Sequence, residues 1–362
     1  MSSYPKWNQV TAGYTRDETE KPRDVMNKLM IAIRSLVIMA CLTVPIASSA
    51  DPVTRLFCVF DPVGHKGPLF TLMKEAQVIA LDWGIQLDMT AYTDEGVAEY
   101  DFRAKQCDAV LLTGTRARNF NKFTGSLEAM GAIPSTQAMR LVLHTLMQPR
   151  AYPLLVENGV EVAGIYPAGA IYLLTRDKSI NHVTKLQGQR VATLENDKAS
   201  MAMVRHVGGT IVSATSATFA GLFNNGSADI AYAPLVAFEP LEMAKGVDPN
   251  GGIFNYAIAQ MNFQMLIHPE RFPPGFGQKA RELAIPKFDD AFEIVAKAES
   301  RISDKYWIQP EDGNRISYDN MLKEVRLSLR DEGVYHPKAL KLFKRIRCKQ
   351  QPNDADCSDP RE

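Results

Sequence analysis

Strands alternate with helices along most of this chain, and no other feature of the sequence restricts the possible folds as strongly. Residues 55–60 (RLFCVF) are apolar after Arg55, which is typical of a buried strand in a parallel sheet. Apolar residues at helical spacing follow over 68–82, and a second strand is predicted over 85–92. A helix begins after the cap residues 93–95, and a third strand spans 108–112. This alternation predicts an α/β fold built on a parallel sheet with right-handed crossovers.

The alternation restarts near residue 165, in a second unit that is not a sequence repeat of the first. Residues 160–176 predict two strands joined at Pro167-Ala168-Gly169. Further strands are predicted at 190–194, 210–214 and 229–233, with helices at 196–207, 216–224 and 234–245, the last opened by Pro234. A long strand over 253–267 leads back to the first unit, and the pattern is helical from about residue 275.

We therefore expect two lobes. Lobe I comprises residues 51–163 and 255–362, where the C-terminal helices pack, and lobe II comprises residues 164–254. Two extended crossover segments, near 160–168 and 253–265, would join the lobes and act as a hinge. Two parallel sheets that face each other enclose a cleft, which is the usual place for a small-molecule site.

An apolar run at 35–46 is too short to span a bilayer core about 30 Å thick. The basic residues Lys28 and Arg34 precede this run, and small residues follow it. Residues 26–50 therefore resemble a secretory signal peptide. We predict cleavage after Ala50 and export to the periplasm. An uncleaved anchor and a lipoprotein modified at the cysteine within the run are the alternatives.

The charged residues and the missing motifs exclude several classes of protein. The chain has 41 basic and 41 acidic residues, so it lacks the basic excess of a nucleic-acid-binding protein, and we expect no nucleic-acid partner. The six histidines are scattered, and the sequence contains no HExxH, GxSxG, GxxxxGK[ST] or CxxC motif. We therefore expect no enzyme, no cofactor and no metal site.

Four cysteines remain after the predicted cleavage, and an even number in an exported chain is compatible with disulfides. Cys348 and Cys357 bracket a polar tail, KQQPNDAD, that could not pack by itself, so we predict that they pair. Cys58 lies inside one apolar strand and Cys107 opens another. These two either bridge neighbouring strands or remain buried thiols.

Polar residues follow the predicted strands of both units. Ligands bind beyond the carboxyl ends of strands in open parallel sheets, so these residues are candidates for a binding site. The candidate ligand-binding residues are Asp61, Gly64, Thr93, Asp94, Thr113, Gly114, Arg116, Arg118, Asn121, Tyr166, Glu195, Asn196, Asp197, Tyr232 and Pro234. For most of them, helix capping or loop solvation is the alternative interpretation.

Arg116 and Arg118 are the strongest candidates, because a guanidinium can hold a carboxylate or phosphate with two hydrogen bonds. A solvated loop or a salt bridge between the lobes is the alternative. Backbone N–H groups after Gly64 could hold an anion at the start of a helix, whereas Asp61 could instead cap that helix. A tyrosine at a strand end, such as Tyr232, could contact a ligand or belong to the core.

Several segments resemble known binding proteins. INHVTKLQGQRVATLEND resembles the entry to the second lobe in binding proteins of tripartite ATP-independent periplasmic (TRAP) and phosphonate-type systems, and FNNGSADIAYAP resembles their helix-to-strand step. VFDPVGHKGPLF, FRAKQCDAVLLTG and FNKFTGSLEAMG resemble a group of TRAP-like solute-binding proteins of proteobacteria. The resemblance covers roughly 55–350. It implies a two-lobed, periplasmic-binding-protein-like fold (type II) with a C-terminal helical extension.

One departure from that pattern affects the ligand. TRAP binding proteins usually place an arginine late in the strand after the glycine turn, to pair with a substrate carboxylate. Here Arg190 comes too early, and Ala192 or Thr193 occupies the expected place. We therefore do not assign the organic-acid specificity of TRAP binding proteins to this chain. Either Arg116 replaces the missing charge, or the ligand is not an acid.

The sequence thus predicts a periplasmic solute-binding protein. It would close two lobes over a small polar or anionic molecule and deliver that molecule to membrane transporter subunits. A periplasmic protein without a transport role is the first alternative, one that uses the same fold to bind a protein partner or to act as a sensor. An enzyme is the second alternative, although no motif supports it.

Overall fold

The computed structural model describes residues 51–310, 314–352 and 355–362. The predicted signal peptide and its cleavage site lie outside these residues. No helix in the described part of the chain is both long enough and apolar enough to cross a membrane.

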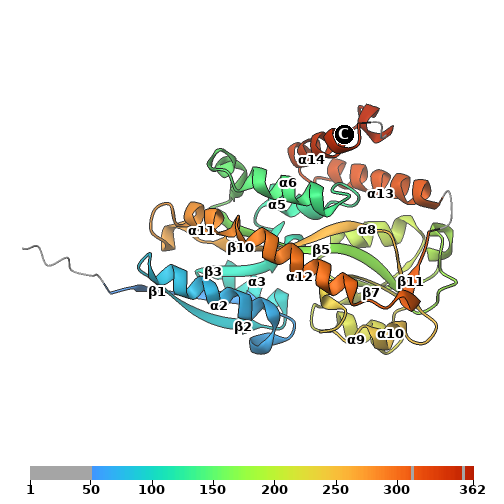
Figure 1. The fold of residues 1–362 in the computed structure, drawn as a ribbon, viewed down its shortest axis with the longest axis horizontal. Coiled ribbons are helices and arrows are strands. Elements are labelled where there is room, and N and C mark those ends of the chain that lie inside the picture. The colour runs from blue at the N-terminus through green and yellow to red at the C-terminus, as the bar shows by residue number, and fades with distance from the viewer. Residues whose placement is uncertain (1–50, 311–313, 353–354) are drawn as a thin grey trace, which may run out of the picture. The chain divides into compact units, whose positions relative to one another are not determined.

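Three parallel strands form the first half of a single large sheet (Figure 1). They are β1 (Val53–Phe60), β2 (Ile85–Tyr92) and β3 (Ala109–Thr113), in the order β2-β1-β3. Helices α2 (Pro68–Leu81) and α3 (Glu95–Arg103) make the crossovers, as predicted. The N-cap Asp94 accepts a hydrogen bond from Gly96 N at 2.8 Å, which fixes where α3 begins. A disulfide joins Cys58 of β1 to Cys107, which lies two residues before the neighbouring strand β3, so these cysteines are not free thiols.

The second half of the sheet has the same parallel arrangement. Its strands are β6 (Arg190–Leu194), β7 (Thr210–Ala214) and β8 (Ile230–Pro234), in the order β8-β6-β7. Helix α8 (Lys198–His206) connects β6 to β7, and α9 (Phe219–Asn224) connects β7 to β8. Strands β6 and β7 begin and end where the sequence predicts them.

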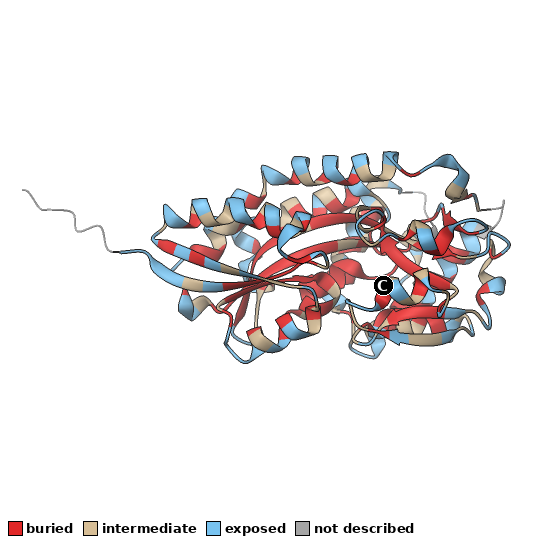
Figure 2. Ribbon diagram, turned by 90° about the horizontal axis from the view of Figure 1, so that it is seen from below, coloured by how far each residue is buried: buried red, intermediate tan, exposed pale blue. Residues whose placement is uncertain are grey.

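Two long antiparallel strands connect the two halves. Strand β5 (Val160–Thr175) pairs with β8, and β10 (Ala259–Ile267) pairs with β3. Because β5 and β10 also pair with each other, the main sheet runs continuously in the order β2-β1-β3-β10-β5-β8-β6-β7. Figure 2 shows that most residues of these strands are buried, while the covering helices expose their outer faces.

The prediction of two strands over 160–176 is wrong, because β5 is one strand with a bulge. Met261 of β10 lies opposite Gly169 and Asn262 lies opposite Pro167, which leaves Ala168 without a partner. Proline cannot donate a ladder hydrogen bond, and Gly169 has φ +98°, so the chain bends here without ending the strand.

Two further predictions need correction. Residues 253–267 form two strands, β9 (Gly252–Phe254) and β10, and β9 pairs with both β5 and the short β11 (Trp307–Ile308). The helix predicted over 234–245 is broken into a 3₁₀ turn η5 (Leu235–Ala237) and α10 (Ala244–Val247). Pro240 lacks an N–H and Glu242 has φ +52°, and neither is compatible with an uninterrupted helix.

The remaining elements cover the sheet and complete its first half. Short elements follow β3: α4 (Gly114–Ala117), α5 (Lys122–Gly125), the 3₁₀ turn η2 (Ser126–Glu128), α6 (Thr136–Leu146), α7 (Tyr152–Leu155) and β4 (Val156–Glu157). The C-terminal helices are α11 (Phe276–Ala284), α12 (Lys287–Ser300), α13 (Asn314–Asp331) and α14 (Pro337–Gln350). Helix α12 packs on β5 and η5, in the middle of the view in Figure 1.

The sequence predicts that the C-terminal helices pack on the first unit, but α13 contacts α8 of the second unit while α14 contacts α6. The predicted Cys348–Cys357 disulfide is present and closes the tail onto α14. Buried Arg326 and Arg347 both pair with the Glu362 carboxylate at 2.9 Å. Each also donates to a backbone oxygen at 2.8 Å, Arg326 to Met130 and Arg347 to Ala132. The tail and both helices are thus fixed to the loop that follows η2.

Candidate functional site

A pocket of about 270 Å³ lies where strands of the two halves end. Its lining includes the residues at or just after the carboxyl ends of four parallel strands: Phe60 at the end of β1 with Asp61 after it, Thr113 of β3, Leu194 of β6 and Pro234 of β8. Both halves of the sheet therefore contribute to one cavity, at the place where ligands bind in open parallel sheets.

Apolar side chains form most of the pocket wall. Alternate residues of β10 face the pocket, because successive side chains of a strand point to opposite faces. The larger apolar lining residues are Phe60, Leu69, Leu72, Ile171, Phe219, Val236, Met261, Phe263, Ile294 and Val295. Ile294 of α12 is nevertheless 55% exposed, so this helix borders the pocket where it meets solvent.

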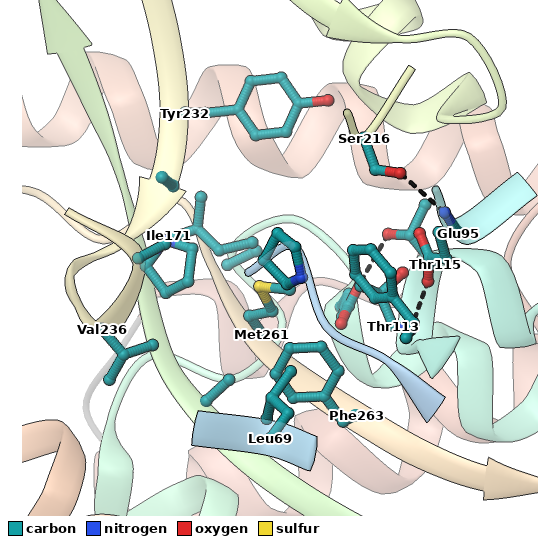
Figure 3. Close-up of a pocket in the computed structure, with 18 of the residues that line it drawn as sticks. Leu69, Glu95, Thr113, Thr115, Ile171, Ser216, Tyr232, Val236, Met261 and Phe263 are labelled. Carbon is teal, nitrogen blue, oxygen red and sulfur yellow. Dashed lines mark hydrogen bonds between the residues drawn. The ribbon is translucent and has the colours of Figure 1, made fainter. Parts of the chain in front are cut away.

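Four polar residues lie together on one side of the pocket, away from Ile171 and Val236 (Figure 3): Glu95, Thr113, Thr115 and Ser216. Thr113 N–H donates to Glu95 Oε1 at 2.5 Å. The backbone N–H of Glu95 donates to Ser216 Oγ at 2.8 Å. Since Glu95 opens α3 and Ser216 follows β7, this hydrogen bond links the first half of the sheet directly to the second.

Glu128 is a buried acid of the pocket with a raised pKa. It is 5% exposed, and burial raises its pKa to about 7. Its Oε2 accepts from Thr115 Oγ1 at 2.5 Å, and its Oε1 accepts from the backbone N–H of Asn262 at 2.9 Å. These hydrogen bonds and the charge of Arg118 favour the ionised form but do not outweigh the desolvation.

The second half of the sheet contributes Asp197, Ser200 and Tyr232. Asp197 caps α8, because its Oδ1 accepts from the N–H groups of Ala199 and Ser200, each at 3.1 Å. The Tyr232 hydroxyl donates to Asp197 Oδ2 at 3.0 Å. Burial, followed by the charge of Asp197, raises the pKa of Tyr232, so the phenol stays protonated and keeps donating.

The structure brings about half of the sequence-predicted candidates to this pocket. Those in its lining are Asp61, Thr113, Arg118, Tyr166, Asp197, Tyr232 and Pro234. Those outside its lining are Gly64, Thr93, Asp94, Gly114, Arg116, Asn121, Glu195 and Asn196. Asp61 caps α2, with Oδ2 accepting from Leu69 N at 2.8 Å and from Phe70 N at 3.0 Å. A ligand-binding role for any of them stays a prediction.

Arg116 does not replace the arginine that TRAP proteins place after the glycine turn. Its Nη1 donates to Glu99 Oε2 at 2.9 Å, and its Nε lies 3.6 Å from Glu95 Oε2. The guanidinium is buried against α3, where two carboxylates already hold it. Asn121 is used similarly for structure, because its Oδ1 accepts from Thr124 N at 2.8 Å and caps α5.

Arg118 has a different environment. Its Nε donates to Gly125 O at 3.0 Å, and its guanidinium lies over the ring of Tyr335 at 5.1 Å from the centroid. Its Nη2 is buried without a hydrogen-bond partner among the described residues. Arg118 is also the only basic residue among the described residues that line the pocket.

Sequence reasoning missed Glu95, Thr115, Glu128, Ser200 and Ser216. Thr115 follows a predicted strand within two residues and could have been included on that ground. Glu128 had no such signal, because a 3₁₀ turn far from any strand end places it. The period-two pattern of 259–263 could have identified the β10 wall. The described residues contain no cluster of His, Cys, Asp and Glu that could hold a metal ion.

Two half-sheets joined by two long antiparallel strands, with a pocket at the strand ends, define the two-lobed fold of periplasmic solute-binding proteins. A TRAP periplasmic solute-binding protein from Ralstonia eutropha, solved with bound (S)-2-acetolactate, has a TM-score of 0.67 at 9% identity, covering 82% of this chain and 99% of that one. A second, from Haemophilus influenzae with bound L-gulonate, has a TM-score of 0.67 at 10% identity, covering 81% and 99%. The predicted fold class is confirmed.

Sequence comparison identifies the family. The model for solute-binding protein AdeT 1/2 matches residues 75–362, and the chain belongs to this family. The relative named "Probable solute-binding protein AdeT1", from Acinetobacter baumannii, is 37% identical over 300 residues, which cover 83% of this chain and 99% of the relative. AdeT2 of the same organism is 27% identical over 233 residues, covering 64% and 98%. The family is one of solute-binding proteins and not of enzymes.

Proposed function

We propose that this protein captures a small organic molecule in the pocket between its two half-sheets, in the periplasm, and delivers it to a membrane transporter. The pocket itself carries this proposal, because side chains from both halves line one cavity that side chains do not fill. A cleft filled by side chains would have favoured a protein-binding or sensory role in the same fold.

The lobe boundaries and the hinge belong to this proposal. Lobe I comprises 51–163 and 255–362, and lobe II comprises 164–254. The pairing of β5 with β10 supports a hinge in these strands, since its register shifts between Met261 and Asn262 and between Met265 and Leu266. Bulges interrupt the ladder and let a strand bend. The hydrogen bond from Glu95 N to Ser216 Oγ would then hold the lobes closed.

The shape of the pocket restricts the size and polarity of the solute. A volume of about 270 Å³ is close to the lower limit for small-molecule sites. Its wall is mostly apolar, and Glu95, Thr113, Thr115 and Ser216 form a polar group on one side. Of the two ligand classes expected from the sequence, polar or anionic, this lining supports a polar solute with an apolar body. Export through cleavage after Ala50 remains part of the proposal.

A matched pair of tryptophan substitutions on α12 tests whether solute enters this pocket. Ala291 lines the pocket, whereas Ala296 of the same helix is exposed and does not. The experiment exposes exported residues 51–362 to a panel of small metabolites and measures the shift in Tm. Ala291→Trp should abolish any shift that the native protein shows, and Ala296→Trp should preserve it. Equal loss in both variants, or equal retention, would place capture elsewhere.

A further inference from the structure

Two acids of the pocket lining, Asp61 and Asp197, are used to cap helices. Both oxygens of Asp61 accept backbone N–H groups from the segment 63–70, which leads into α2. Both oxygens of Asp197 accept as well. Its Oδ1 accepts two backbone N–H groups of α8, and its Oδ2 accepts from Ser200 Oγ at 2.5 Å and from the Tyr232 hydroxyl at 3.0 Å. The protein itself therefore supplies hydrogen-bond donors to each of these carboxylate oxygens.

The other two acids of the lining are occupied in the same way. Glu128 Oε2 accepts from Thr115 Oγ1 at 2.5 Å, and its Oε1 accepts from the backbone N–H of Asn262 at 2.9 Å and from the Asn262 side chain at 3.2 Å. Glu95 accepts a backbone N–H through Oε1, and its Oε2 lies 3.6 Å from Arg116 Nε. The four acids that line the pocket thus already have partners within the protein.

Arg118 differs from these acids, because most of its hydrogen-bonding capacity is unused. Its Nε donates to Gly125 O at 3.0 Å, but neither of its terminal nitrogens donates to a described residue. Its Nη2 is buried, where an unmade hydrogen bond is most costly. The ring of Tyr335 supports the guanidinium from one face, with its centroid 5.1 Å away. Two N–H-bearing nitrogens of a fixed guanidinium are therefore left for a partner that accepts hydrogen bonds.

Two hydroxyl groups of the lining can donate as well. Burial alone raises the pKa of Tyr166 to about 12, and no hydrogen bond joins its hydroxyl to another described residue. The phenol therefore stays protonated and able to donate. Ser216 Oγ accepts from Glu95 N, which leaves its O–H to donate. The lining thus offers unused donors to a solute, while its carboxylate acceptors are occupied.

We propose that the solute is an apolar molecule with one oxygen acceptor group, and that Arg118, in the first half of the sheet, holds this group. This assignment of the solute class rests on the proposed solute-binding function. A carboxylate and a neutral carbonyl share the required chemistry, because each presents oxygen lone pairs to the terminal nitrogens of a guanidinium. An ammonium group carries donors only, and it would face the unused donors of the pocket.

The position of Arg118 differs from that of the arginine that TRAP binding proteins place in the strand after the glycine turn. In β6 of this chain, Ala192 and Thr193 are fully buried, and Leu194 is the residue of the strand that lines the pocket. Arg118 instead follows α4 and packs against α5. A Cβ at Gly125 would lie 2.4 Å from Arg118 Cα, so this packing requires a glycine. The polar end of the solute is therefore held by the first half of the sheet and not by β6.

The apolar wall determines the body of the solute. Met261, Phe263 and Leu69 lie on the side of the pocket away from Ser216 (Figure 3). A solute with polar groups at both ends would bury one of them against such side chains without a hydrogen-bond partner, which is costly. An arylalkyl or alkyl body with a single polar end matches this lining.

Four small molecules test the solute class by calorimetric titration into residues 51–362 at pH 7. Two of them, 3-phenylpropionate (anionic) and 4-phenyl-2-butanone (neutral), carry an acceptor group on the same apolar body. The third, 3-phenylpropylamine, carries a cationic donor on that body, and succinate is polar at both ends. The tighter of the two acceptor molecules should bind at least about tenfold more tightly than the amine and succinate, and its identity shows whether the acceptor is charged or neutral. A smaller margin overturns the proposal, and so does an absence of binding by all four.

Substitutions of arginine test whether Arg118 holds the acceptor. Arg118→Met removes the donors and keeps an unbranched side chain, and it should weaken the tighter acceptor molecule about tenfold or more. Arg150→Met removes an exposed arginine outside the pocket lining and should change nothing. Arg118→Lys keeps the positive charge but loses the planar pair of nitrogens, so it should also weaken binding and serves if Arg118→Met does not fold. Unchanged binding in a folded variant of Arg118 overturns the proposal.

Substitutions of glutamate test the opposite arrangement, in which an acid of the pocket holds a donor group of the solute. Glu293 is exposed on α12 and lies outside the lining, so Glu293→Gln is the control for Glu128→Gln. Neither substitution should weaken the tighter acceptor molecule, because the oxygens of Glu128 already have partners. Loss of binding in Glu128→Gln alone would overturn the proposal.

The proposed function has an independent readout. Native mass spectrometry of the exported chain detects a captured solute of any class. A captured molecule that has an ammonium group and no oxygen acceptor would overturn the inference and leave solute capture standing. Binding of the acceptor molecules that Ala291→Trp does not affect would instead contradict the proposed pocket.

Discussion

Replacing Glu128 by glutamine should change how the stability of the fold depends on pH. Burial raises the pKa of Glu128 from an ordinary value near 4.5 to about 7. The folded protein therefore holds this proton to a higher pH than the unfolded chain does. Between about pH 4.5 and pH 7 the folded state binds more protons, so the contribution of Glu128 to stability falls as the pH rises.

The magnitude follows from the shift. The difference between a pKa of 4.5 and one of about 7, at about 1.36 kcal/mol per pH unit, lowers the free energy of unfolding by about 3 kcal/mol. This loss is complete above pH 7. Glutamine carries no charge and accepts from Asn262 as glutamate does, although it loses the charged acceptor for Thr115 at a cost of about 1 kcal/mol. The variant should thus be about 2 kcal/mol more stable than the native protein at pH 8, and no more stable at pH 4.5.

Urea unfolding followed by circular dichroism at pH 4.5, 6, 7 and 8 measures this difference. The native protein should lose stability relative to Glu128→Gln as the pH rises, and Glu293→Gln should follow the native curve. Parallel curves for the native protein and Glu128→Gln would refute the reasoning. A variant that is less stable than the native protein at pH 8 would refute it as well, because Glu128 would then be ionised and favourable in the fold.

Two further predictions concern the framework around the pocket. Arg281 is fully buried and donates to Glu161 Oε1 at 2.6 Å and to Val162 O at 2.8 Å. Because Arg281→Met leaves Glu161 buried and unpaired, it should lower the free energy of unfolding by about 3–5 kcal/mol. Urea unfolding measures this change, and a decrease below about 1 kcal/mol would contradict the prediction. Replacing Cys348 and Cys357 together by serine should lower the free energy of unfolding by about 3 kcal/mol, because the unfolded chain then loses the constraint of a closed loop. An unchanged urea midpoint would show that the disulfide adds no stability.

The regular elements could be predicted from the sequence because local patterns determine them. Strands such as β2 and β7 are flanked by glycine turns and helix caps, so their limits are visible in the chain. Two of the errors lie where a proline acts within a longer element. Pro167 lies in a bulge that the pairing with β10 sustains, and pairing is not encoded locally. Pro240 breaks a helix that apolar spacing alone would continue.

The pocket was only partly predictable for a related reason. Strand-end reasoning found Asp197 and Tyr232, because parallel strands place their carboxyl ends at one edge of the sheet. It could not show that Arg116 turns toward Glu95 and Glu99, since side-chain direction depends on how α3 packs. The loop after Glu128 is held by Arg326 of α13 and Arg347 of α14, across sequence separations of 196 and 215 residues. Contacts between residues so far apart in the chain leave no recognisable pattern in the local sequence.

Native mass spectrometry of residues 51–362, exported to a bacterial periplasm and purified gently, tests the central claim most directly. The proposed function predicts a discrete added mass that disappears on denaturation and that Ala291→Trp prevents from binding. An unliganded mass, together with no thermal stabilisation across a broad panel of small metabolites, would contradict solute capture in this pocket.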